Sequence, residues 1–234
     1  MNEKIVYACF CTDIIHEGHL NIIREANKLG KLTIGVLCDS EMVRYTRYLT
    51  KNTEERVRMV EGLNGVENVI VQNSLLYDDV ISSLRPDYVI HGSNWQIGPM
   101  SKIRKHLIKL LDAYGGELVE IPYTYNPDVQ KIDKRMREVM AMPEFRRHQL
   151  RRLLNIVPIV KTLEVHSGLT GLIAEKTIVP TDTGVDQFDA MWISSLCDST
   201  EKGKPDIELV DMTSRFRTID DIMEVTTKPI IFDG

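Results

Sequence analysis

Short apolar runs alternate with amphipathic stretches through the first half of the chain. Five apolar, β-prone runs have the length of buried strands, and they span residues 4–11, 32–38, 66–72, 87–91 and 117–123. Between them, apolar positions recur at helical spacing over about 20–29, 53–63, 78–84 and 100–114. Gly30, Pro86 and Gly115 mark the ends of three of these helices. Strands and helices that alternate at these lengths predict an α/β fold with a doubly wound parallel sheet.

The pattern changes after residue 126. Residues 126–142 are charged and helical in pattern, and a second helix follows over 144–155. A β-rich region comes next, with a strand and a small-residue turn in 163–173 and strands at 188–196 and 229–233. We therefore expect a first domain at 1–125, a linker at 126–143 and a second domain at 144–234. Because the chain stops directly after a strand, we interpret the second domain as incomplete.

Composition narrows the class of protein. The 234 residues are 43% hydrophobic and 27% charged, with a formal net charge of −5, which argues against a general nucleic-acid binder. No apolar run approaches the roughly 18 residues that a membrane span needs. The four cysteines, Cys9, Cys11, Cys38 and Cys197, include no C-x-x-C pair. We expect free thiols, a cytoplasmic location and no membrane partner. Cys9 and Cys11 share one face of the first strand because they are two residues apart.

A histidine motif lies where the first strand turns into the first helix. Thr12 and Asp13 lead into His16, Gly18 and His19, which form an H-x-G-H sequence. Free backbone N–H groups and the helix dipole make such a turn an anion site, and Gly18 lets a phosphate approach the backbone. The alternative is two ordinary surface histidines near a turn. Because a strand and a helix flank the motif, we favour a phosphate-binding site for a nucleoside triphosphate.

Further candidate residues follow other strand ends, where ligands of doubly wound sheets bind. Arg47, Lys51 and Arg56 could reach a triphosphate, although each taken alone is more often a solvated surface charge. Asn94 and Trp95 follow the fourth strand and could seat the base or the ribose. A tryptophan at such a place is equally often a packing residue.

The first half resembles the cytidylyltransferase family of the glycerol-3-phosphate cytidylyltransferase type over about residues 4–124. The resemblance rests on Asp13-x-x-His16-x-Gly18-His19, on Glu55-Arg56 and on Gly92-x-Asn94-Trp95. It implies a Rossmann-like nucleotidyltransferase with His16 and His19 as catalytic residues and CTP as substrate. The implied nucleotide-binding residues are Thr12, Asp13, Gly18, Arg47, Arg56, Asn94 and Trp95. The family's Gly-Thr-Phe and its late Arg-Thr-x-Gly-Ile-Ser-Thr signature are replaced here, the first by residues 10–12 and the second by residues 123–129.

The second half resembles phosphoenolpyruvate phosphomutase, a member of the isocitrate lyase superfamily with a modified (β/α)8 barrel. The matching stretches are residues 164–170, 188–196 and 229–234. The resemblance implies substrate binding by Trp192, Ser194, Ser195 and Leu196, a catalytic Asp206 and Mg²⁺ held through Asp233. Without the resemblance, we would interpret Asp206 and Asp233 as solubilising loop residues.

Together the two resemblances imply a phosphonate-biosynthesis enzyme. We expect a mutase that converts phosphoenolpyruvate to phosphonopyruvate, fused to a domain that transfers CMP from CTP to a small phosphonate. The alternative for the first domain is a catalytically degenerate nucleotide-binding or assembly module, which the replaced late signature favours. We also expect a homo-oligomer, no nucleic-acid partner, and no mutase activity in residues 1–234 alone.

Overall fold

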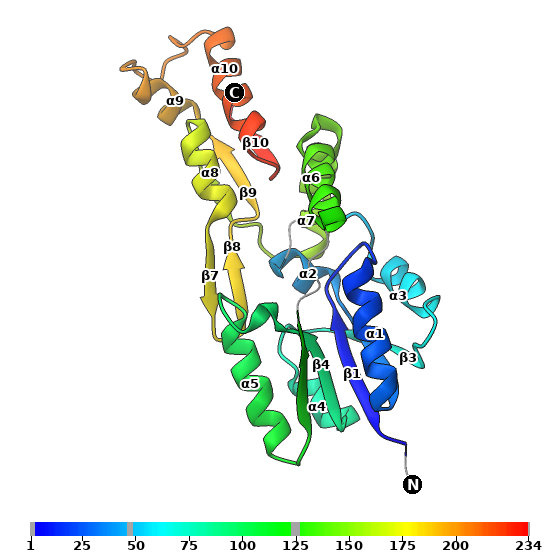
Figure 1. Ribbon diagram of the computed structural model, residues 1–234. Helices are drawn as coiled ribbons and strands as arrows, with labels where there is room; N and C mark the ends of the chain where they lie inside the picture. Colours follow the sequence, from blue (N-terminus) through cyan, green and yellow to red (C-terminus); the bar gives the residue numbers. More distant parts are fainter. Residues whose placement is uncertain (1–2, 46–48, 123–126, 234) are drawn as a thin grey trace. The chain divides into compact units, whose positions relative to one another are not determined.

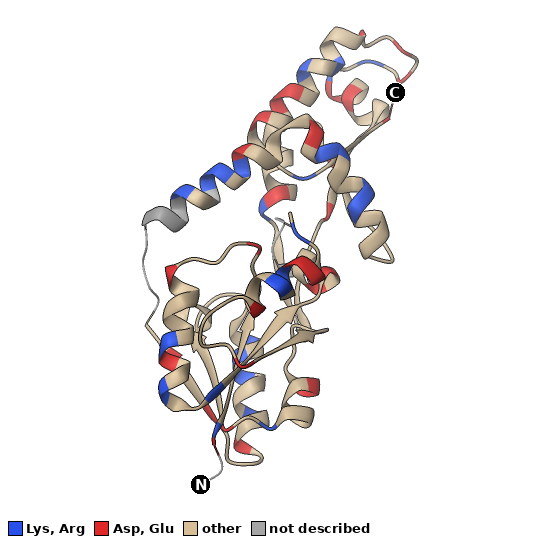
Figure 2. Cartoon of the chain, turned by 90° about the vertical axis from the view of Figure 1, so that its right-hand side faces the viewer, with Lys and Arg blue, Asp and Glu red and all other residues tan. Residues whose placement is uncertain are grey.

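The computed structural model describes residues 3–45, 49–122 and 127–233 (Figure 1). The chain divides into two units, and each is described by itself. Unit 1 comprises residues 1–130 and 179–186, and unit 2 comprises residues 131–178 and 187–234. Most of the stretch expected to be a linker, 126–143, therefore belongs to unit 2. Acidic and basic residues occur together on helices of both units (Figure 2).

A five-stranded parallel sheet forms the centre of unit 1. Its strands are β1 (Ile5–Phe10), β2 (Lys31–Leu37), β3 (Asn68–Gln72), β4 (Tyr88–Gly92) and β5 (Glu117–Ile121). They lie in the order β3-β2-β1-β4-β5, and every adjacent pair is parallel. The predicted α/β fold with a doubly wound sheet is confirmed. The strand order reverses beside β1 and β4, and this is where such sheets bind ligands.

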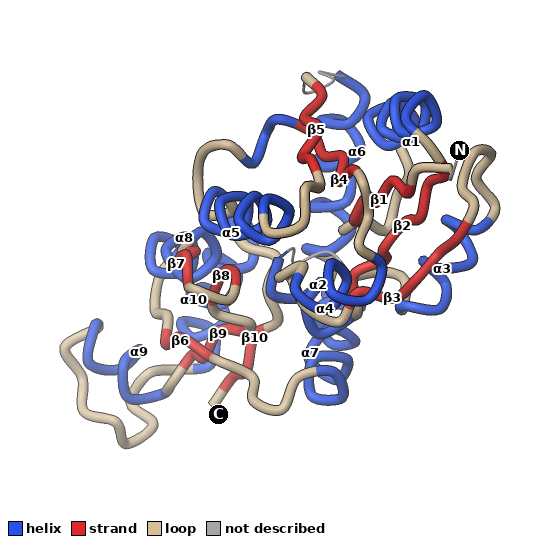
Figure 3. The backbone as a smooth tube through the Cα atoms, turned by 90° about the horizontal axis from the view of Figure 1, so that it is seen from below, coloured by secondary structure: helices blue, strands red, loops and turns tan. Residues whose placement is uncertain are grey.

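Helices cover both faces of this sheet (Figure 3). The helices of unit 1 are α1 (Glu17–Leu29), α2 (Asp39–Tyr45), α3 (Thr53–Glu61), α4 (Asp78–Leu84) and α5 (Ser101–Asp112), with a 3-10 turn η1 (Ser93–Trp95) after β4. Alternate residues of β1 enter different cores, because successive side chains of a strand point to opposite faces. Val6 packs in the core with Ile23 of α1, whereas Tyr7 packs with Leu107 of α5. Helix α2 follows β2 in a stretch for which the sequence predicted no helix.

Unit 2 alternates short strands with helices. Helices α6 (Pro127–Ala141) and α7 (Pro143–Ile156) precede β6 (Thr162–Glu164), α8 (Gly168–Lys176), β9 (Ala190–Ile193), α9 (Ser195–Glu201), α10 (Met212–Val225) and β10 (Ile230–Phe232). The three strands form a parallel sheet in the order β10-β9-β6. A separate two-stranded sheet pairs β7 (Ile178–Thr181) with β8 (Gly184–Gln187).

In the segment 163–173 the expected strand is present as β6, which ends at Glu164, but the expected turn is wrong, because helix α8 takes its place. Helix α8 begins at Gly168, because the Ser167 and Thr170 side chains satisfy each other's backbone N–H groups in a capping box. Gly171 then lets this helix approach α10, since a Cβ atom there would lie 3.2 Å from a methyl carbon of Ile222. The parallel strands and intervening helices match the way a (β/α)8 barrel begins.

The basic residues of α7 are not all exposed to solvent. Arg146 is 4% exposed, and its guanidinium donates to the carbonyl oxygens of Ala141 at 3.0 Å, Met223 at 2.8 Å and Lys228 at 3.0 Å. It also donates to the side chain and the carbonyl of Thr226. Arg146 therefore fixes α7 to the segment that leads into β10.

None of the helices among the described residues combines the length and the apolar character that crossing a bilayer requires.

Candidate functional site

A cavity of about 260 Å³ opens at the carboxyl ends of β1, β4 and β5. The residues that line it are Cys9, Phe10, Cys11, Thr12, His16, Gly18, His19, Ile22, His91, Gly92, Asn94, Ile121 and Pro122. They include the H-x-G-H motif, Thr12 and Asn94 of the predicted site. None of the described lining residues is an Asp, Glu, Lys or Arg, so this wall offers hydrogen-bond donors rather than full charges.

The two motif histidines cap the first helix. His16 is the N-cap of α1, and its Nδ1 accepts the backbone N–H of Gly18 at 3.1 Å. The Nδ1 of His19 accepts the N–H of His16 at 3.3 Å. The ring centroids lie 4.0 Å apart, and the His19 ring also packs 4.7 Å from that of Phe10. Both imidazoles are thus fixed by the fold before any ligand binds.

Burial keeps these two rings neutral. It lowers the pKa of His16, and burial followed by the nearby His16 lowers the pKa of His19 to about 3. Because a neutral imidazole carries one proton and each Nδ1 is an acceptor, the proton of each ring is on Nε2. The motif therefore provides two N–H donors without the cost of burying two positive charges.

Gly18 and Thr12 shape the turn that carries the histidines. A Cβ atom on Gly18 would lie 2.9 Å from Cε1 of His16, so a larger residue would displace that ring. Thr12 Oγ1 accepts the N–H of Ile14 at 3.0 Å and donates to the Ile14 carbonyl at 2.7 Å. These contacts close the loop between β1 and α1 over the strand end.

His91 is a third histidine of the cavity, and the sequence analysis missed it. Its Nδ1 lies 2.7 Å from the Gly92 carbonyl oxygen and therefore donates to it. Its ring stacks on that of Trp95, with centroids 3.7 Å apart and an interplanar angle of 11°. Burial lowers the pKa of His91. Its position near the end of the fourth predicted strand could have identified it in the sequence, because ligands of such sheets bind at strand ends.

Trp95 lies behind the cavity wall. It is 3% exposed, and its Nε1 donates to Glu120 at 2.7 Å. Arg104 binds the same carboxylate with its Nε at 2.8 Å and its Nη2 at 2.6 Å. The Arg104 guanidinium, followed by the Trp95 hydrogen bond, holds the pKa of Glu120 at about 2. Trp95 thus supports His91 in this geometry instead of lining the space for a ligand.

Asp13 and Arg56 form a buried ion pair outside the lining. The Arg56 guanidinium is completely buried and donates to the Leu37 carbonyl at 2.5 Å and to Asp39 at 2.5 Å. Its Nε lies 3.6 Å from Asp13. The expectation that Arg56 reaches a triphosphate is wrong, because the guanidinium is buried and both of its terminal nitrogens already donate to protein groups.

The Asp13 carboxylate binds the loop before α3. It accepts hydrogen bonds from the N–H and hydroxyl of Thr50, the latter at 2.8 Å, and from the N–H of Lys51 at 3.1 Å. Asp13 therefore fixes residues 50–51. The predicted residue Arg47 lies outside the described residues.

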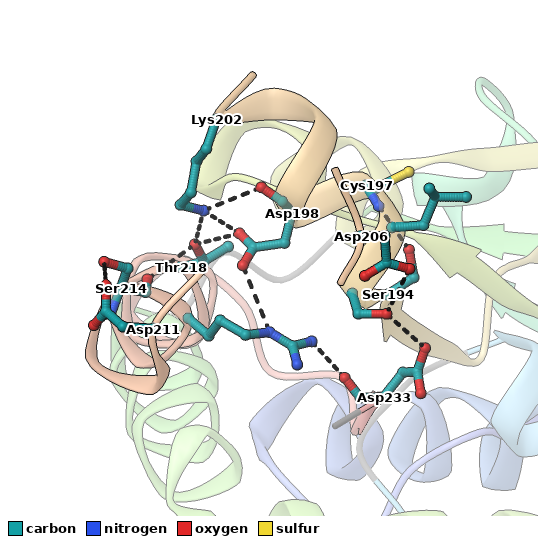
Figure 4. Close-up of polar contacts among 12 residues, drawn as sticks. Ser194, Cys197, Asp198, Lys202, Asp206, Asp211, Ser214, Thr218 and Asp233 are labelled. Carbon is teal, nitrogen blue, oxygen red and sulfur yellow. Dashed lines mark hydrogen bonds and ion pairs between the residues drawn. The ribbon is translucent and has the colours of Figure 1, made fainter. Parts of the chain in front are cut away.

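Ser195 contacts two predicted carboxylates of unit 2, Asp206 and Asp233, whose positions are shown in Figure 4. Ser195 Oγ lies 3.2 Å from Oδ2 of Asp206 and 3.4 Å from Oδ2 of Asp233. Ser195 and Asp206 also line a cavity of about 650 Å³. Three predicted residues are thereby brought together, with Ser195 at the start of α9, two residues after β9, and Asp233 directly after β10.

The other predicted residues of unit 2 have different surroundings. Ser194 is the N-cap of α9: its hydroxyl accepts the N–H of Cys197 at 3.0 Å and donates to Glu164. Trp192 and Leu196 are exposed and do not line this cavity.

Two charged residues that the sequence analysis did not select support Asp233. Arg215 Nη2 donates to the backbone carbonyl of Asp233, and its Nε lies 3.6 Å from Asp198. Asp198 is buried and also accepts from Lys202 and from Thr218 (Figure 4). This chain of contacts fixes the end of β10.

The donor set around Ser195 suits a hard cation. Among the described residues, no group of three or more His, Cys, Asp or Glu side chains could hold a metal ion. Asp206 and Asp233 nevertheless face one hydroxyl, and Mg²⁺ is commonly bound by one or two carboxylates together with water and substrate oxygens. The residues present therefore fit Mg²⁺ when a substrate completes its shell.

Comparison with known families divides the chain in the same order. A family model described as cytidylyltransferase-like matches residues 7–151. A model described as phosphoenolpyruvate phosphomutase matches residues 150–234.

Similar curated proteins match the first half. The bifunctional protein HldE of Desulfatibacillum aliphaticivorans is 28% identical over 123 residues, which cover 51% of this chain and 24% of that protein. An FAD synthase of Thermococcus sibiricus is 25% identical over 131 residues, covering 55% of this chain and 86% of the synthase. This chain therefore spans about a quarter of the length of that HldE protein. A lipopolysaccharide core biosynthesis protein from Thermoplasma volcanium GSS1 has a similar structure, with a TM-score of 0.44 and 20% identity over 53% of this chain and 100% of the other.

Proposed function

We propose that unit 1 transfers CMP from CTP to a small phosphonate, because this chain belongs to the cytidylyltransferase-like family. A phosphoenolpyruvate phosphomutase domain follows the cytidylyltransferase-like region. The observation that carries the proposal is the pair of neutral imidazoles of His16 and His19 at the N-terminus of α1, inside a cavity. Two fixed N–H donors at a helix N-terminus suit the phosphates of a nucleotide.

The chemistry requires positioning more than covalent help from the protein. A phosphonate oxygen attacks the α-phosphorus of CTP, the bond from that phosphorus to the bridging oxygen breaks, and pyrophosphate leaves. His16 and His19 Nε2–H groups donate to phosphate oxygens on which negative charge grows. Donors fixed in advance stabilise the transition state more than the ground state. Asp13 and Arg56 contribute indirectly, because they fix the loop at residues 50–51.

We propose that unit 2 contributes to the rearrangement of phosphoenolpyruvate to phosphonopyruvate. In that reaction the bond from phosphorus to the enol oxygen breaks and a bond from phosphorus to C3 forms. Asp233, with Asp206 beside it, would hold Mg²⁺, which neutralises charge on the transferring group. The Ser195 hydroxyl lies between the two carboxylates and orients them. Trp192, Ser194 and Leu196 are the further proposed substrate-binding residues.

A pyrophosphate-release assay tests the first activity. The purified chain is incubated with Mg²⁺, CTP and either 2-aminoethylphosphonate or 2-hydroxyethylphosphonate, with glycerol 3-phosphate as the comparison acceptor. ATP is the comparison nucleotide, because one similar protein is named for a product that contains adenine. We expect release that depends on a phosphonate and on CTP.

Two other results would change the proposal. Release with ATP but not with CTP would reject the assignment of the nucleotide. Calorimetric binding of CTP without release for any acceptor would favour the second candidate, a nucleotide-binding module without catalysis. The lack of Asp, Glu, Lys and Arg among the lining residues that the structure describes is the observation that favours this second candidate.

A further inference from the structure

Two thiols lie side by side in the wall of the unit 1 cavity. Cys9 is in β1 and Cys11 follows it, and their Sγ atoms are 3.8 Å apart. Both residues line the cavity, and both are partly accessible. The proposed transfer uses neither of them. Cys11 lies in residues 10–12, which replace the Gly-Thr-Phe of the family that this sequence resembles, and Cys9 directly precedes them.

The spacing of the sulfur atoms fits chelation better than a disulfide. Two sulfur atoms bound to one centre at about 2.3 Å each are about 3.8 Å apart at a tetrahedral angle and about 3.4 Å apart at the narrower angle of pyramidal trivalent arsenic. A disulfide instead requires sulfur atoms about 2.05 Å apart. Reaching that distance would require bending the end of β1, where Cys9 is paired with Gly35 in the central sheet. A bridging atom requires no such movement.

The surroundings of Cys9 disfavour its thiolate. The hydrogen bond with Cys11 and burial both raise the pKa of the Cys9 thiol well above its usual range. A high thiol pKa slows attack on oxidants, because the thiolate is the reactive form. A soft centre can displace the protons on binding, since thiolates bind such centres strongly.

We propose that Cys9 and Cys11 form a dithiol site that chelates a soft, thiophilic centre, such as Cd²⁺ or trivalent arsenic, inside the cavity. With a monosubstituted arsenic oxide, two S–H bonds break, two As–S bonds form, and the arsenic-bound oxygen leaves as water. With a divalent cation, two protons are released, so binding tightens as the pH rises. A centre bound there occupies the space proposed for the nucleotide. This last consequence rests on the proposed function, whereas the dithiol site itself does not.

Phenylarsine oxide is the probe, because it bridges two thiols. Intact-mass spectrometry of the native chain should show one adduct per molecule. The variants Cys9→Ser and Cys11→Ser should each bind at least tenfold more weakly. The matched controls Cys38→Ser and Cys197→Ser should bind like the wild type. Circular dichroism establishes that each variant is folded, and the half-exposed Cys11 gives an independent variant if Cys9→Ser does not fold.

The dependence of the adduct on each cysteine and on CTP decides between the claims. An unmodified native chain, or an adduct that survives Cys9→Ser or Cys11→Ser, would overturn the dithiol site. An adduct that Cys38→Ser abolishes would assign the chelate to a different pair and would also overturn it. If saturating CTP slows adduct formation, the site and the nucleotide share the cavity. If the adduct forms equally fast with CTP, the dithiol site stands and the proposed location of the nucleotide fails.

Discussion

The two candidate sites of this chain use opposite chemistry at equivalent places. Each lies where parallel strands end, at β1 and β4 in unit 1 and at β9 and β10 in unit 2. In unit 1, half-buried neutral imidazoles donate from a wall whose described residues include no Asp, Glu, Lys or Arg. In unit 2, the exposed carboxylates of Asp206 and Asp233 face one hydroxyl.

The difference concerns which partner each site selects. A desolvated wall of N–H donors favours an anion, because each donor is fixed and is not satisfied by bulk water. A pair of exposed carboxylates favours a cation and retains its solvent until the cation binds. The first site is therefore part of the core of unit 1, whereas the second lies at the surface of unit 2. Mutations should separate the two.

The largest effect should come from the ion pair beneath the first site. Arg56→Met leaves the buried Asp13 and the partly buried Asp39 without their partner, and we expect a loss of about 3–5 kcal/mol in the free energy of unfolding. Urea denaturation measures it. Arg58→Met is the matched control, because the Arg58 side chain is 75% exposed and its pair with Glu54 is 3.7 Å long, so its loss should stay within about 1 kcal/mol. Equal losses in the free energy of unfolding for the two variants would contradict the inference that the Arg56 ion pair stabilises unit 1.

The next effect concerns the motif histidines. His16→Ala or His19→Ala should lower the rate of CMP transfer by roughly 10²–10³, because each removes one fixed donor to the transition state. Since His16 is also an N-cap, its removal should destabilise the chain by about 1 kcal/mol. A pyrophosphate-release assay measures the rate. His106→Ala, which removes an exposed histidine paired with Asp78, should keep full activity. Near wild-type transfer by both motif variants would reject the assignment.

Acid should destabilise unit 1 through the same histidines. The pKa of His19 is about 3 in the folded chain and near 6.5 when unfolded. Between these values the unfolded state binds more protons, so stability is fully present above pH 6.5 and falls as the pH drops toward 3. Thermal unfolding across this range measures the slope. His19→Asn should reduce the slope, and an unchanged slope would show that burial of His19 is not its cause.

The smallest effect should come from the second site. Asp206→Asn and Asp233→Asn change exposed side chains, so the free energy of unfolding should change by no more than about 0.5 kcal/mol. The same urea experiment measures it. A loss comparable to that of Arg56→Met would contradict the division into a core site and a surface site.

Much of the fold could be predicted from the sequence, because buried parallel strands appear as apolar runs. Helix α8 could not, since its small residues and two glycines resemble a turn. It depends on the Ser167 cap and on contact between Gly171 and Ile222, which lies 51 positions further along the chain. Only the tertiary structure provides that contact.

The candidate site of unit 1 could likewise be predicted only in part from the sequence. His16, Gly18 and His19 could be predicted because one turn between a strand and a helix contains them all. The burial of Arg56 could not, because its partners Asp13 and Asp39 come from other segments. His91 joins the cavity only through the pairing of β4 with β1.

The most direct test is ¹⁵N NMR of the histidine rings during titration with CTP. We predict that His16 and His19 are neutral at pH 7, with the proton of each ring on Nε2 and with Nδ1 unprotonated. CTP should then shift both Nε2 resonances while those of His106 stay unchanged. Rings that are protonated at pH 7, or CTP binding that leaves His16 and His19 unshifted, would contradict the account.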